Sequence, residues 1–73
     1  MMEKQKILYL THEEALQTEI ALESLLKLLL EEYEQIQGTS GETAAMRIIR
    51  SHRAALEKVK DVNRQFRNEI EDL

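Results

Sequence analysis

Apolar residues recur at steps of three and four along two stretches of the chain, which is the spacing of side chains on one face of an α-helix. The first stretch gives a seam (a line of residues that faces another helix) of Leu8, His12, Ala15, Glu19, Leu22, Leu26, Leu29, Tyr33 and Ile36. The second gives Ala45, Ile48, His52, Ala55, Val59, Val62, Phe66 and Leu73, widened on one side by Ile49, Leu56 and Ile70. The pattern predicts two helices that pack along these seams.

A polar stretch with two glycines separates the seams. Gly38 suits the left-handed conformation that ends a helix, and Thr39 or Ser40, with Glu42 just beyond, suits a capping box for the next helix. A short turn makes two long helices antiparallel neighbours. The sequence therefore predicts an all-α fold, an antiparallel two-helix hairpin with helices over about 11–36 and 42–72 and a turn over 37–41.

The first helix has its own start signal. Thr11 supplies a hydroxyl at the cap position, and Glu14, three residues later, supplies the carboxylate of a capping box. Residues 1–10 precede this signal, and three alternatives stay open for them: a frayed tail, a short extra helix, or an arm ordered by a partner.

Folding the chain back at the turn predicts which residues meet across the seam. The expected pairs are Leu29 with His52, Leu26 with Ala55, Leu22 with Val59, and Ala15 with Phe66. Small residues then face large ones, as a closely packed seam requires.

The first helix carries more leucine than its seam uses. Leu16, Ile20 and Leu30 flank the seam on one side, and Ala21, Leu25 and Leu28 flank it on the other. Exposed together, such residues form the kind of patch that marks a binding surface, whereas singly exposed leucines are ordinary. We interpret them as a partner-binding surface; the alternative is a hairpin with scattered surface leucines.

Length and composition also favour association. A chain of 73 residues without Cys has no disulfide or thiolate metal site to stabilise its small core, so an oligomeric or partner contact is expected. No stretch is long and apolar enough for a membrane span or a signal-peptide core, which predicts no membrane partner. The lack of Cys is compatible with a cytoplasmic location.

The two helices are oppositely charged. From Glu13 to Glu34 the first carries seven Glu and one Lys, and Arg and Lys predominate from Arg47 to Arg67. Edges such as Glu23 and Lys58 are expected to approach. One outer face of the second helix carries Arg50, Arg53, Glu57, Lys60, Arg64 and Arg67. This face is interpreted as a solvated surface rather than a phosphate site, because no aromatic residue is interleaved for base stacking, and no nucleic-acid partner is expected.

The sequence shows no catalytic constellation. His12 and His52 lie far apart without zinc-ligand spacing, and the glycines do not form a phosphate-binding loop. Across the hairpin, His12 is expected near Glu69. We therefore expect no enzyme activity, no catalytic or cofactor-binding residues, no metal site and no cofactor.

The chain resembles the small co-chaperones of bacterial type III secretion needles. The resemblance rests on a Leu-rich first helix (Glu14-Ala15 through Leu30), a Gly-containing turn (Gly38 to Gly41), and an Ala-Leu-Glu stretch in the second helix (Arg53-Ala54-Ala55-Leu56-Glu57). It implies a cytoplasmic, non-enzymatic protein that binds a larger chaperone of tetratricopeptide-like helical repeats and helps keep the needle subunit unpolymerised. The residues that it implies for docking are Leu22, Leu25, Leu28 and Leu29.

Two other functions stay open. The surplus leucines of two copies can join into a symmetric four-helix-bundle dimer. Alternatively, the chain is a small regulator that uses its Glu-rich helix to block a transcription or signalling protein.

Overall fold

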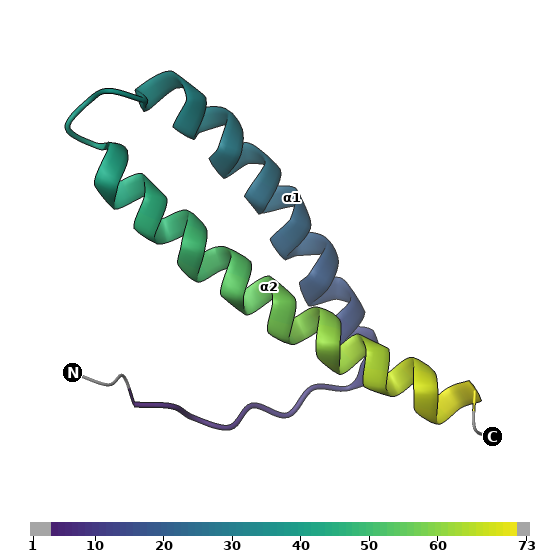
Figure 1. Cartoon of the computed structure of the whole chain (residues 1–73). Helices are drawn as coiled ribbons and strands as arrows, with labels where there is room; N and C mark the ends of the chain where they lie inside the picture. The colour runs from purple at the N-terminus through teal and green to yellow at the C-terminus, as the bar shows by residue number, and fades with distance from the viewer. Residues whose placement is uncertain (1–3, 72–73) are drawn as a thin grey trace.

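The computed structural model describes residues 4–71 and contains two long antiparallel helices joined by a short turn (Figure 1). Helix α1 spans His12–Ile36 and helix α2 spans Glu42–Glu71, and no strand occurs among the described residues. The predicted all-α two-helix hairpin is confirmed. Leu73, which was expected at the end of the second seam, lies outside the described residues.

The predicted capping box at the start of α1 is present. The Thr11 hydroxyl accepts a hydrogen bond from the Glu14 backbone N–H at 3.2 Å, and the Glu14 carboxylate accepts one from the Thr11 N–H at 2.8 Å. These bonds satisfy two donors at the helix end that have no partner within the helix. Because they favour the charged carboxylate, they lower the pKa of Glu14.

The turn combines a left-handed glycine with a carboxylate that binds across it. Gly38 has a φ of 80°, as predicted. The Glu42 carboxylate accepts hydrogen bonds from the Gly38 N–H and the Tyr33 hydroxyl, both at 3.0 Å, and the second of these raises the pKa of Tyr33. The expected second capping box is therefore wrong in its partners, because the Thr39 N–H donates to the Ile36 carbonyl instead.

The buried core is small because the hairpin is a single layer of two helices. Its buried residues are Ala15 on α1, and Ile49, Leu56 and Asn63 on α2. The last three are spaced by seven and define the observed α2 seam. Ile49 and Leu56, which were predicted to widen the seam, are buried, whereas the predicted places of Ile48, Ala55 and Ile70 are wrong, since all three are exposed. Ala45, His52, Val59 and Phe66 of the expected seam are half-buried, so the buried face of α2 is turned by only about half of the 100° step between neighbouring residues.

The two helices also pair in a different register from the expected one. Phe66 stacks on His12 with ring centroids 5.0 Å apart, and the Asn63 amide donates to the Ala15 carbonyl at 3.0 Å. The expected pairs of Ala15 with Phe66 and His12 with Glu69 are therefore wrong by nearly one turn. The residue numbers of both observed pairs add up to the same value as Ile36 and Glu42, which bound the turn. The Phe66 and Asn63 contacts therefore keep the register that begins at the turn, whereas the contact of His52 with Leu22 departs from it by about one helical turn.

Residues 4–10 form no regular structure (Figure 1). The side chains of Ile7, Leu8 and Tyr9 are exposed, so the expected place of Leu8 in the first seam is wrong. The alternative of a short extra helix is therefore wrong for residues 4–10.

Candidate protein-binding surface

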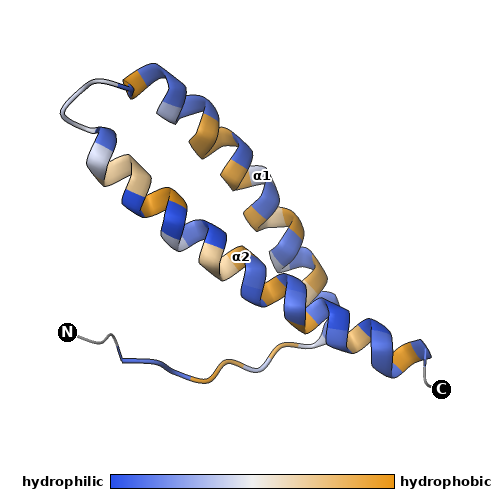
Figure 2. Cartoon of the chain, viewed as in Figure 1, coloured by the Kyte–Doolittle hydropathy of each residue, from blue (hydrophilic) through white to orange (hydrophobic). Residues whose placement is uncertain are grey.

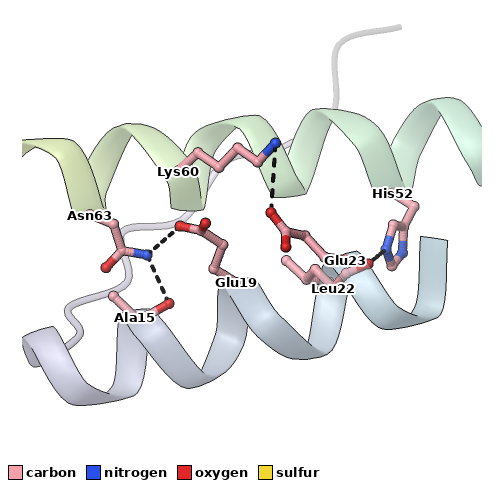
Figure 3. Close-up of polar contacts among 7 residues, drawn as sticks. All are labelled: Ala15, Glu19, Leu22, Glu23, His52, Lys60 and Asn63. Atoms are coloured by element: carbon pink, nitrogen blue, oxygen red, sulfur yellow. Dashed lines mark hydrogen bonds and ion pairs between the residues drawn. The ribbon is translucent and has the colours of Figure 1, made fainter. Parts of the chain in front are cut away.

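Polar side chains of α2 fix the seam at two points (Figure 3). The amide of Asn63, a residue only 3% exposed, donates to the Ala15 carbonyl and to the Glu19 carboxylate, the latter at 2.8 Å. His52 Nε2 lies 2.6 Å from the Leu22 carbonyl oxygen, so the expected pairing of His52 with Leu29 is wrong. Both contacts use carbonyls of α1 and hold the helices at a fixed height relative to each other.

Sequence reasoning missed Asn63 because a polar residue interrupts an apolar pattern. The signal was nevertheless present, since Asn63 follows Ile49 and Leu56 at successive steps of seven.

The surplus apolar residues of α1 lie on two different faces of the hairpin. A hollow near the turn is lined by Leu30, Tyr33, Met46, Ile49, Arg50 and Arg53. A second is lined by Leu29, Glu32, Tyr33, Ile36, Ala45, Ile48 and Ile49. Tyr33 and Ile49 belong to both hollows and mark the seam between them. Leu30 and Met46 therefore lie on one side of the seam, and Glu32 and Ile48 on the other.

Helical periodicity extends each side along the molecule. We call the side of Leu30 and Met46 the Leu16 face; it comprises Leu16, Ile20, Glu23 and Leu30 from α1 and Met46, Arg50, Arg53 and Lys60 from α2. We call the side of Glu32 and Ile48 the Leu25 face; it comprises Ala21, Leu25, Leu28 and Glu32 from α1 and Ala44, Ile48, Ser51, Ala55 and Val62 from α2. The Leu16 face is mixed with charged groups of both signs, which include Lys27 and Glu34 at the same helical positions. The Leu25 face is apolar or small over most of its length, with Lys58 and Glu69 toward the C-terminal end of α2.

The predicted partner-binding residues divide into two groups. Four are exposed: Leu16 at 43%, Ile20 at 58%, Leu25 at 47% and Leu28 at 56%. Leu22, Leu29 and Leu30 are half-buried, and the first two belong to the intramolecular seam. Figure 2 shows apolar positions recurring along the length of α1, while polar residues dominate the visible side of α2.

The charged groups of α2 form weak local pairs. Lys60 lies 3.8 Å from Glu23 across the Leu16 face, so the expected approach of Glu23 to Lys58 is replaced by this pair. Arg64 pairs with Asp61 on its own helix at 3.3 Å. All four side chains are substantially exposed, and such pairs contribute about 0–1 kcal/mol each. They influence orientation more than stability.

Within residues 4–71, no group of three or more His, Asp or Glu side chains gathers as a metal ion would require, and neither helix is long and apolar enough to cross a membrane. His12 is occupied by its stacking on Phe66 and His52 by its contact with α1. The surface that remains to be explained is therefore apolar.

The fold and the exposed apolar faces define this chain as a helical hairpin, a structural class that includes many unrelated proteins. Comparison with known proteins does not assign the chain to a family within that class. Neither family models, nor curated proteins, nor solved structures give a match to this chain.

Proposed function

We propose that the chain is a non-enzymatic protein–protein interaction module that packs exposed apolar side chains of α1 against another helical protein. The observation that carries the proposal is the exposure of Leu16, Ile20, Leu25 and Leu28 on a helix whose seam toward α2 is filled by other residues. Burying a fully exposed side chain of this size contributes about 1.5–3 kcal/mol, and each of these half-exposed side chains can contribute roughly half of that, so a partner that covers several of them gains substantially.

The Leu16 face suits a helical partner with acidic margins. Leu16 and Ile20 lie one turn apart, as the anchors of a helix–groove contact do. Further toward the turn, Leu30 and Met46 line a shallow hollow together with Arg50 and Arg53. The guanidinium groups can pair with carboxylates that flank an apolar stripe on the partner.

The resemblance to type III secretion co-chaperones supports a more specific form of the proposal. In this form the partner is a larger cytoplasmic chaperone built of tetratricopeptide-like helical repeats. We place its contact on Leu16 and Ile20 and not on the docking residues that the resemblance implies, because Leu22 and Leu29 are half-buried in the seam. The two proteins together would keep the needle subunit from polymerising. The chain would then act by covering apolar surface on that complex and not by any chemistry of its own.

The test is capture of partners from the native host by the whole chain, with identification by mass spectrometry. We expect a helical-repeat protein to bind the unchanged chain and the Ser24→Glu control, whose substitution lies on α1 opposite the seam. The double variant Leu16→Glu/Ile20→Glu should lose that protein while circular dichroism shows unchanged helix content.

Two results would contradict the proposal. One is a partner set that Leu16→Glu/Ile20→Glu and Leu25→Glu/Leu28→Glu both leave unaltered. The other result bears on the co-chaperone form. It is a needle subunit that polymerises equally fast with and without this chain when the larger chaperone is present, as followed by light scattering.

A further inference from the structure

The Leu25 face is an apolar surface to which both helices contribute. On α1 it presents Leu25 and Leu28, about half-exposed, and on α2 it presents Ile48 at 55% exposure with the half-buried Val62. Unlike the Leu16 face, it has no cross-helix ion pair within residues 4–71.

The two halves of this face complement each other in size. The α1 half carries the large side chains of Leu25 and Leu28. On the α2 half, Ser51 and Ala55 are small and exposed, and they follow Ile48 at helical spacing. Leucines of one copy therefore find space over the small residues of α2 in another copy.

The two halves also complement each other in charge. Glu32 lies on the α1 half of the face beside the seam, where it lines a hollow with Ile48. Arg47 lies at the α2 edge, one turn from Ala44 and Ser51. Both side chains are exposed, and within residues 4–71 neither forms an ion pair. A surface that carries both members of a complementary pair is suited to pack against itself about a two-fold axis.

We infer that a second copy of this chain covers the Leu25 face and forms a symmetric four-helix bundle. Two arrangements place the faces together: α1 on α1 of the second copy, or α1 on α2. The first brings two acidic helices into contact, whereas the second brings the acidic helix onto the basic one. The charges select α1 on α2, with the two-fold axis along the helices and both turns at the same end of the bundle.

A two-fold axis parallel to the helices leaves each residue at the same position along the bundle in both copies. Glu32 lies beside Ile48 in its own chain, so it comes level with Arg47 in the second copy. Helix α1 is about 37 Å long and a helix pair is about 20 Å wide, so the face covers roughly 700 Å², close to one side of a standard interface. The inference goes beyond the proposed function, because it leaves the Leu16 face free for a different protein.

The experiment is sedimentation equilibrium of the whole chain over a wide range of protein concentration. We expect a mass twice that of the 8.6 kDa chain. Leu25→Glu/Leu28→Glu should be monomeric, whereas Leu16→Glu/Ile20→Glu and the Ser24→Glu control should remain dimeric. Because the mass does not depend on capture of the other protein, failure of this inference is distinguishable from failure of the proposed function.

A charge exchange tests the pairing of α1 with α2. Glu32→Arg places two cations together and should weaken the dimer about tenfold, and Glu32→Arg/Arg47→Glu should recover most of that loss. A monomer at every concentration, or a Leu25→Glu/Leu28→Glu variant that stays dimeric, would overturn the inferred interface. A dimer indifferent to both charge changes would overturn the arrangement of α1 on α2.

Discussion

At the scale of single residues, Asn63 contributes more to specificity than its polarity suggests. Its amide bonds both the Ala15 carbonyl and the Glu19 carboxylate, while its carbonyl oxygen is buried without a hydrogen-bond partner among residues 4–71. A leucine there would bury more apolar surface. The asparagine instead favours the one register in which its amide meets acceptors, as a single buried polar residue does in coiled coils.

The two glycines of the turn differ in what they require. Gly38 adopts the left-handed conformation, which strains any residue with a Cβ atom, whereas a Cβ atom on Gly41 would meet the Thr39 Oγ1 at an ordinary 3.8 Å. We predict that Gly38→Ala lowers the free energy of unfolding by about 1–2 kcal/mol, while Gly41→Ala changes it little. Urea denaturation measures both values, and equal losses would contradict the assignment.

At the scale of elements, the sequence left the orientation of α2 ambiguous. Ile48 and Ile49 each belong to a series of residues spaced by three and four. The predicted seam runs through Ile48 and Ala55, and the alternative series runs through Ile49 and Leu56. The observed seam keeps His52 and Val59 but uses Ile49 and Leu56 in place of Ile48 and Ala55. Amphipathic spacing predicted that α2 exists, whereas only packing against α1 decided which isoleucine is buried.

The two isoleucines therefore provide a matched test of the α2 seam. Ile49→Ala removes a side chain that is 7% exposed and should lower the free energy of unfolding by about 2–4 kcal/mol. Ile48→Ala should cost the isolated hairpin little, because it removes an exposed side chain and improves helix propensity. Thermal denaturation at low protein concentration, where the inferred dimer dissociates, measures both losses. A larger loss of stability for Ile48→Ala than for Ile49→Ala would show that Ile48 lies in the seam.

The start of α1 should make the stability of the helix depend on pH. The backbone and side-chain hydrogen bonds with Thr11 lower the pKa of Glu14 below its ordinary value of 4.5. A lowered pKa in the folded state contributes stability that is present above pH 4.5 and is lost as the pH falls through the folded value. We predict that Glu14→Gln flattens the acid limb of a helix-content titration by circular dichroism. An unchanged acid limb would show that the capping box does not carry this dependence.

At the scale of the whole molecule, a single layer of two helices has few positions that can be buried. Leu16 and Ile20 on one face, and Leu25 and Leu28 on the other, remain exposed after the seam has formed. The lack of stabilising cross-links and the excess of leucine pointed to association from the sequence. The division into two faces, one mixed with Arg50 and Arg53 and one flanked by Glu32 and Arg47, required the tertiary structure.

By itself, the sequence determined two amphipathic helices, the left-handed glycine, the Thr11–Glu14 cap and the excess of apolar residues on α1. These features depend on local spacing and local hydrogen bonds, which a single stretch of chain contains. Only the tertiary structure decided that Asn63 is buried, that Phe66 meets His12, and that Ile48 faces outward. These outcomes depend on how a tight turn sets the height and rotation of one helix against the other, and no local pattern records that relation.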